Sequence, residues 1–372
     1  MANKTIGIMT FHASYNFGSV MQAYGLLSYL RRAAYDAEII NFRPVAQIDK
    51  YSLLPMRYGA KNFVRTLTTV PWMSERARSN KKYERFIHDF LTDSPALGYM
   101  SELDGCRDCD VYLTGADQVW GFHIPEFDKS KEDIRPAYYF SFATGKKISY
   151  ASSTGAATYE QLMPYADLLK SYSHISVREP KSVALIKQMT DRDATCCLDP
   201  TFLISPDDLN HLGEDGRAEE KPYALIYTLQ GIRNRKYWQE LAQEVYSRLG
   251  VECIAVSPFY HLAGSHIECR MDAGPLDILA LFREAQFILT DTFHGSLFSI
   301  HFRKPFVAFE PNRDDERIRG ILTSFDLMGR VAHDVPAATR LIVPELDYSP
   351  TESAIQEKIA LSTHYLLDAI EH

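Results

Sequence analysis

Three polar residues, Asp291, Thr292 and His294, stand close together in the stretch ILTDTFHGSLFSI, residues 288–300. The apolar residues before Asp291 predict a buried strand and those after His294 predict a helix. Asp291 or Thr292 can cap that helix. His294 then lies in the first helical turn, where backbone N–H groups and the helix dipole favour an anion. A histidine there can bind phosphate or carboxylate or transfer a proton, and the alternative is a structural histidine.

Two more polar residues follow predicted strands. Arg178 suits two-point binding of a phosphate or carboxylate, and the alternative is a salt bridge to Glu179 or Asp199. Asp117 can accept a proton from a sugar hydroxyl while Gln118 orients the sugar, and the alternative is an Asx-type turn. These positions therefore suggest chemistry on small anions and sugars.

Other patterns exclude common kinds of site. The loop at residues 16–19, NFGS, resembles a phosphate or sugar cradle but has neither GxGxxG nor GxxxxGK[ST] spacing. The CxxC at residues 106–109 has no second CxxC at zinc spacing, and the 12 histidines show no HExxH pairing. We therefore expect no dinucleotide site, no P-loop site and no metal site.

Parallel strands must position these residues. Short apolar strands alternate with amphipathic helices, and the pattern restarts at residue 223 after a polar, turn-rich segment. We predict an α/β fold with two Rossmann-like domains, residues 1–205 and 223–350, joined by a linker at 206–222. Since ligands bind at the carboxyl ends of parallel strands, we expect the two domains to face a cleft that holds the site.

Composition fits this class. The chain has 372 residues, 46% of them hydrophobic and 24% charged, with a net charge of −8 that argues against a general nucleic-acid binder. No secretory signal and no long apolar run are apparent, so we expect a cytoplasmic protein with reduced thiols. Residues 57–85 carry eight basic and two acidic residues. They predict either a solvated helical face or a patch that meets anionic lipid or a lipid-linked substrate.

Seven motifs in order resemble the polysaccharide pyruvyl transferase family over residues 6–325: TFHASYNFGSVMQAYGLLSYL, LTGADQVW, KISYASSTG, SVREPKSVALI, LDPTFL, LTDTFHGSLFSIHFRKPFVAF and ERIRGIL. The resemblance implies a fold similar to GT-B glycosyltransferases, with the last helix, 351–372, packing back on the first domain. It also implies a reaction in which the enolpyruvyl group of phosphoenolpyruvate moves onto two sugar hydroxyls. The product is a cyclic pyruvate ketal, phosphate is released, and no cofactor is needed.

The same resemblance implies roles for individual residues. His294 and Asp117 would be catalytic, the histidine at the donor and the aspartate as a base. Phosphoenolpyruvate would be bound by Arg178, Thr292, His294, Gly295 and Ser296, and the acceptor by Asn16, Gly18, Gln22 and Gln118. Some family members carry an arginine where this chain has Thr292. Arg303, Arg313 or Arg317 would then supply the missing charge.

The leading hypothesis is therefore a pyruvyl transferase that acts on a lipid-linked or nucleotide-linked saccharide in exopolysaccharide or capsule synthesis. The basic segment 57–85 would favour peripheral contact with the inner face of the membrane. One alternative is a GT-B glycosyltransferase with a nucleotide-sugar donor. The other is a saccharide-binding relative that has lost catalysis, an option that Thr292 leaves open.

Overall fold

The computed structural model of the protein describes the following parts of the chain: residues 4–53, 70–122, 124, 127, 130, 132–214, 219–230, 234–258, 260–311 and 316–372. The chain divides into two compact units. Unit 1 comprises Met1–Phe63, Glu84–Ile204 and Glu357–His372. Unit 2 comprises Val64–Tyr83 and Ser205–Gln356.

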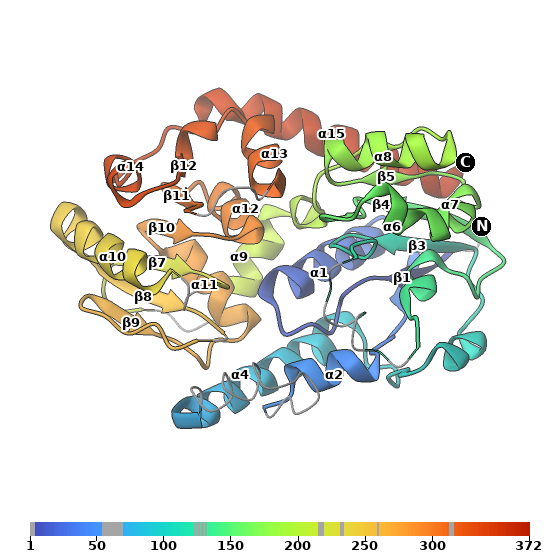
Figure 1. Cartoon of the computed structure of the whole chain (residues 1–372), viewed down its shortest axis with the longest axis horizontal. Coiled ribbons are helices and arrows are strands. Elements are labelled where there is room, and N and C mark those ends of the chain that lie inside the picture. The colour runs from blue at the N-terminus through green and yellow to red at the C-terminus, as the bar shows by residue number, and fades with distance from the viewer. Residues whose placement is uncertain are drawn as a thin grey trace. The chain divides into compact units, whose positions relative to one another are not determined.

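A four-stranded parallel sheet with the order β2-β1-β3-β4 forms the centre of unit 1 (Figure 1). Its strands are β1 (Thr5–Met9), β2 (Asp36–Ile39), β3 (Val111–Gly115) and β4 (Lys146–Tyr150). Isolated bridges join the region of β4 to the parallel pair β5 (Ser176–Val177) and β6 (Thr195–Cys196). The chain leaves β1 for β2 on one side and later returns to β3 on the other, which makes a topological switch point between β1 and β3.

Helix α1 (Phe17–Arg32) follows β1 and buries one side, including Leu26 and Leu30, in unit 1. It packs against the short helix η7 (Pro200–Leu203). The other helices wholly within unit 1 are α2 (Val45–Tyr51), η3 (Ile87–Leu91), η4 (Met100–Gly105), η5 (Arg135–Tyr139), α6 (Tyr159–Leu162), η6 (Met163–Tyr165), α7 (Ala166–Lys170) and α8 (Pro180–Thr190).

Unit 2 has a six-stranded parallel sheet with the order β12-β11-β10-β7-β8-β9. The strands are β7 (Tyr223–Tyr227), β8 (Glu252–Val256), β9 (Ile267–Cys269), β10 (Phe287–Thr290), β11 (Phe306–Phe309) and β12 (Val331–Ala332). Its helices are η2 (Val70–Trp72), α9 (Pro206–Glu214), α10 (Arg235–Leu249), α11 (Pro275–Glu284), α12 (Phe293–His301), α13 (Glu316–Ser324), η8 (Met328–Arg330) and α14 (Val335–Arg340). Here the switch point lies between β7 and β10.

The prediction of two Rossmann-like α/β units is confirmed. The linker expected at residues 206–222 is not what the structure shows, because helix α9 occupies its first half and packs on α11 in unit 2. Leu209 and Leu212 are buried on this helix. A proline at the start and two aspartates in the first turn are features of a helix start. The same residue types are common in turns, so the polar composition of this segment also resembles that of a linker.

Helices α4 (Met73–Phe86) and α15 (Ser349–Glu371) each contribute residues to both units. Within unit 2, Lys82 on α4 forms a 2.7 Å ion pair with Asp277, so residues 73–83 do not belong to the first domain as expected. Within unit 1, the end of α15 is fixed by a 2.9 Å hydrogen bond from the Leu198 N–H to Ser362 and a 3.1 Å bond from Tyr365 to the Ser149 carbonyl.

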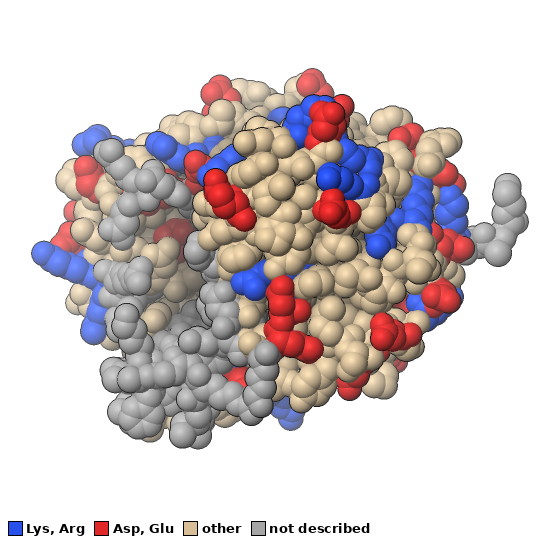
Figure 2. Space-filling model, turned by 45° about the vertical axis from the view of Figure 1, so that its right-hand side comes forward, with Lys and Arg blue, Asp and Glu red and all other residues tan. Residues whose placement is uncertain are grey.

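The basic segment lies partly outside the described residues, which lack 57–69. In its described part, Arg78 pairs with Glu75 and Asp272, and Lys82 pairs with Asp277. On the coloured part of the face shown in Figure 2, basic and acidic side chains are interspersed. Among the helices of the described chain, none is long and apolar enough to cross a membrane.

Gly25 sets the contact between α1 and η7. A Cβ atom at this position would lie 2.2 Å from the Pro200 carbonyl oxygen, so we expect Gly25→Ala to destabilise unit 1 by about 2 kcal/mol. Gly320 in α13 is a matched control with open space around it, where alanine should stabilise by roughly 0.5–1 kcal/mol. Urea unfolding of both variants measures the difference, and equal stabilities would contradict the packing at Gly25.

Candidate functional site

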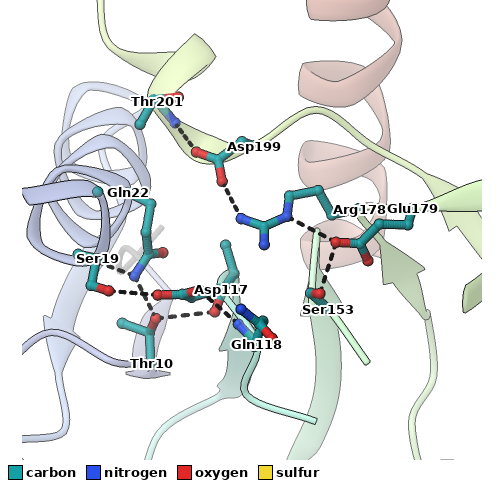
Figure 3. Close-up of polar contacts among 12 residues, drawn as sticks. Thr10, Ser19, Gln22, Asp117, Gln118, Ser153, Arg178, Glu179, Asp199 and Thr201 are labelled. Carbon is teal, nitrogen blue, oxygen red and sulfur yellow. Dashed lines mark hydrogen bonds and ion pairs between the residues drawn. The ribbon is translucent and has the colours of Figure 1, made fainter. Parts of the chain in front are cut away.

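A polar cluster, the Asp117 cluster, lies at the switch point of unit 1 and consists of Thr10, Ser19, Gln22 and Asp117 (Figure 3). Ser19 donates to the Asp117 carboxylate at 2.6 Å, and the Gln22 amide donates to Thr10 and to the Ser19 carbonyl at 2.8 Å. Gln22 is fully buried, and its Oε1 accepts no hydrogen bond from the described residues. The cluster thus offers a carboxylate and an amide oxygen, both of which suit hydroxyl groups.

The backbone and the carboxylate of Asp117 both have defined positions in the structure. Its backbone is left-handed, with φ of 62°, and its Oδ1 accepts the Gln118 N–H at 2.9 Å as in a tight turn. Its Oδ2 faces Ser19 on α1. The turn therefore holds the carboxylate at the switch point, and the role of Asp117 as a base stays a prediction.

Asn16 and Gly18 form the start of α1. The Asn16 side chain caps the helix by accepting the Gly18 N–H at 3.0 Å. These two residues therefore make a helix cap, and their predicted contact with the acceptor remains untested. Gln22 lies further along α1, and its side chain belongs to the Asp117 cluster through its bond to Thr10.

Arg178 follows β5 and is held by two carboxylates. Its guanidinium bonds Asp199 at 2.6 Å and Glu179 at 3.2 Å, and its side chain is 3% exposed. Asp199 also accepts the Thr201 N–H at 3.0 Å, and Glu179 accepts the Ser153 hydroxyl at 2.7 Å. The salt bridges that the sequence left as the alternative are present, and they fix the direction of the guanidinium beside the Asp117 cluster (Figure 3).

Electrostatics keep Arg178 charged in this buried place. Burial opposes the charge, but the carboxylates of Glu179, Asp199 and Asp117 outweigh it and raise the pKa of Arg178. Three carboxylates around one guanidinium make this region acidic. An anion would have to compete with them, so binding of phosphoenolpyruvate by Arg178 stays a prediction.

His12, which the sequence reasoning did not select, is a buried histidine near the end of β1. It bonds Asn41 at 2.9 Å through Nε2 and the Thr10 carbonyl at 3.2 Å through Nδ1. Burial lowers its pKa to about 4, so it is neutral at physiological pH. It links β1 to the segment after β2, which is a structural role.

The strand-to-helix turn of unit 2 forms as the sequence predicts. Helix α12 begins at Phe293, and Thr292 is its cap, accepting the Gly295 N–H at 2.8 Å. Thr290 lies 3.0 Å from the Thr292 hydroxyl and donates to the Tyr227 carbonyl. A Cβ on Gly295 would lie 2.0 Å from the Thr290 hydroxyl oxygen, so glycine is required for this tight turn.

His294 is the second residue of α12 and is partly exposed. Its ring contacts that of Phe293 edge-on at 5.2 Å. Ser296 differs from expectation, because it is fully buried and both its N–H and its hydroxyl donate to the Thr292 carbonyl. The hydroxyl of Ser296 therefore donates within the helix, and its contact with the donor stays a prediction, as does that of His294 at the helix start.

Three arginines are candidates to replace the family arginine at position 292, and their positions in the structure differ. Arg303 follows the far end of α12 and pairs with Glu352 at 2.7 Å, so it is the wrong candidate. Arg313 lies outside the described residues. Arg317 lies on α13, which packs against α12, and it stays a prediction. Thr292 itself supplies a cap instead of a charge.

Asp291 is a strand-end residue whose side-chain partners the sequence does not reveal. Its carboxylate does not cap α12 and instead accepts the Thr228 hydroxyl at 2.7 Å and the Leu229 N–H at 3.4 Å. Burial raises its pKa to about 6, although hydrogen bonds from Thr228, Leu229 and Asn234 oppose that rise. An aspartate directly after the apolar run ILT is the sequence signal for this position.

In the described part of the chain, no group of three or more His, Cys, Asp or Glu side chains could hold a metal ion. The cysteines at 106 and 109 are free thiols. Burial raises the pKa of Cys109 to about 11, so it is not a reactive thiolate.

The fold and the two polar switch points define a GT-B-like α/β protein, and solved structures agree. Similar chains include the S. aureus MnaA–UDP co-structure (TM-score 0.54, 11% identity, 100% and 98% of the two chains covered) and the UDP-GlcNAc 2-epimerase from Methanocaldococcus jannaschii (0.52, 9%, 97% and 99%). A putative UDP-N-acetylglucosamine 2-epimerase from Listeria monocytogenes is similar to the same degree (0.53, 10%, 100% and 96%). At these identities the likeness shows the fold alone.

The family comes from a separate comparison. The model of the polysaccharide pyruvyl transferase family matches residues 16–313, so the chain belongs to this family. A search of curated proteins finds no match. Family membership confirms the resemblance seen in the motifs and indicates an enzyme of polysaccharide biosynthesis that transfers a pyruvyl group.

The Arg178–Asp199 pair gives a testable consequence for stability. Asp199→Asn leaves a buried guanidinium with one carboxylate fewer, and we expect it to cost about 3–5 kcal/mol of unfolding free energy. The control is Asp167→Asn, which removes an exposed pair with Lys170 and should leave stability unchanged within error. Guanidinium unfolding of the two variants is the measurement, and a stable Asp199→Asn protein would argue against the pair.

Proposed function

We propose that this enzyme transfers the enolpyruvyl group of phosphoenolpyruvate to two hydroxyls of a saccharide and forms a cyclic pyruvate ketal with release of phosphate. The observation that carries the proposal is the capped start of α12 at the switch point of unit 2, with His294 in its first turn. The family of the chain supports the pyruvyl group as the unit transferred.

The donor fits the start of α12 by charge. Phosphoenolpyruvate is a small, strongly anionic molecule, and a helix start that follows a parallel strand is a favourable place for a phosphate. His294 is partly exposed there, and an imidazole N–H can donate to a phosphate oxygen. Thr292 and Gly295 contribute by fixing the geometry of the turn.

The acceptor fits the Asp117 cluster of unit 1 by the same reasoning. The carboxylate of Asp117 and the amide oxygen of Gln22 can accept hydrogen bonds, and the acidic surroundings of the cluster favour a neutral polyhydroxyl group over a second anion. Asp117 would take the proton of the attacking hydroxyl. Arg178, whose direction Asp199 and Glu179 fix, would act as the cation of this cluster.

The chemistry balances without a cofactor. The methylene carbon gains a proton, the two hydroxyl oxygens add to C2 in turn, and the C2–O bond to phosphate breaks. Of the two hydroxyl protons, one replaces the proton given to the methylene carbon and the other leaves with the phosphate. The acceptor is a lipid-linked or nucleotide-linked saccharide of exopolysaccharide or capsule synthesis, and peripheral membrane contact through 57–85 is part of the same proposal.

Incubation with phosphoenolpyruvate and candidate saccharides tests the function through phosphate release and acceptor mass. We expect His294→Ala to lower turnover at least about 100-fold, because it removes the donor-side histidine. The control is His364→Ala, an exposed histidine on α15, which should keep full activity.

Three outcomes would contradict the proposal. Transfer from a nucleotide sugar with no use of phosphoenolpyruvate would instead identify a glycosyltransferase. Saccharide binding without turnover of either donor would identify a binding protein. Full activity of His294→Ala would move the donor site elsewhere in the chain.

A further inference from the structure

Asp291 lies where three elements of unit 2 meet. It follows β10 and contacts Thr228, which follows the neighbouring strand β7, as well as Asn234, which precedes α10. His294 is three residues further on, in the first turn of α12. A carboxyl group is thus built into the switch point beside the proposed donor site.

Asn234 is the independent sign that this carboxyl is part of a site. It occupies the cap position of α10, where an asparagine normally accepts a helix N–H, yet its side chain makes no such bond. Its amide instead bonds Asp291. Asn234 is 2% exposed, and its Oδ1 has no hydrogen-bond partner among the described residues. A buried acceptor without a hydrogen bond lowers the stability of a protein, so its presence at this position needs an explanation.

The amide of Asn234 can serve Asp291 in both protonation states. Its nitrogen donates to the carboxylate, and after a turn of the amide its oxygen accepts from the carboxylic acid. Thr228 can likewise donate or accept through its hydroxyl. Among the described residues, Tyr227 also interacts electrostatically with Asp291, and burial keeps its phenol neutral by raising its pKa. No fixed cation among these contacts holds Asp291 in the charged form.

We propose that Asp291 is the catalytic acid that protonates the methylene carbon of the donor, and that Asn234 is its positioning residue. This inference rests on the proposed function and divides the donor chemistry between two side chains. The O–H bond of Asp291 breaks as the C–H bond of the new methyl group forms, and C2 becomes cationic for attack by the hydroxyl. His294 then holds the phosphate, and Asp291 regains a proton from water before the next turnover.

Asp291→Asn tests the acid directly. We expect kcat to fall at least about 100-fold, the usual contribution of a general acid, while the affinity for phosphoenolpyruvate stays within about threefold. The matched control is Asp207→Asn on the exposed surface of α9, which should keep wild-type kcat. Circular dichroism confirms the fold, and Asp291→Glu, which keeps a displaced carboxyl, should recover part of the lost rate.

The pH profile separates catalysis from structure. The acid form is active, so kcat of the wild-type enzyme should fall as pH rises through the pKa of Asp291, which is about 6 without donor and higher beside its phosphate. Asp291→Asn should lose this alkaline limb. Asn234→Leu should move the limb while leaving the affinity for phosphoenolpyruvate unchanged, which a purely structural Asn234 would not do.

A thermal shift gives a readout that needs no turnover. A raised folded pKa means that the native state loses stability relative to the unfolded chain as pH rises through about 6. Asp291→Asn should therefore melt higher than the wild type at pH 8 and gain nothing at pH 4. A melting temperature that is equally changed at both values would overturn the account of its environment.

The failures are distinguishable. If the wild-type protein neither binds nor consumes phosphoenolpyruvate, the proposed function is wrong. If the wild type is active and Asp291→Asn keeps kcat within about threefold, the function stands and the acid lies elsewhere.

Discussion

The hydrogen bond from the Gly295 N–H to the Thr292 hydroxyl is the constraint on which the donor side depends. It allows β10 to end at Thr290 and α12 to begin at Phe293 with two residues between them. The turn is so tight that any side chain at 295 would collide with Thr290. Because the cap comes from Thr292, the Asp291 carboxylate is available to bond Thr228, which follows the neighbouring strand β7.

The two switch points carry different chemistry although both arise from parallel strands. In unit 1, three carboxylates surround Arg178, and the Oε1 of the buried Gln22 is a further acceptor beside them. In unit 2, a helix start and His294 favour an anion, and burial raises the pKa of the nearby Asp291 carboxyl to about 6. The acceptor and donor assignments follow from this contrast in charge.

Much of this could be predicted from the sequence because the signals are local. The apolar run before Asp291, the cap and the glycine determine the strand–turn–helix at 288–300, and the same holds for the start of α1 at Asn16. The membership of residues 73–83 in unit 2 depends on contacts almost 200 residues away in the chain, such as Lys82 with Asp277. No periodicity reports contacts of that kind.

The roles of individual side chains were predictable only in part, because they depend on contacts with residues far away in the chain. Arg178 was selected correctly as a strand-end cation, but its two carboxylate partners decide how it acts. The partners of Asp291 lie about 60 residues earlier, at Thr228 and Asn234, so the sequence showed an aspartate without its environment. Helix α9 was not predicted because its polar composition is also typical of a linker.

A crystal structure of the protein with phosphoenolpyruvate bound tests the central claim most directly. We expect the phosphate at the start of α12 within hydrogen-bond reach of His294, and the methylene carbon next to the Asp291 carboxyl. Donor density at the far end of α12 near Arg303, or elsewhere away from His294, would contradict the placement of the donor.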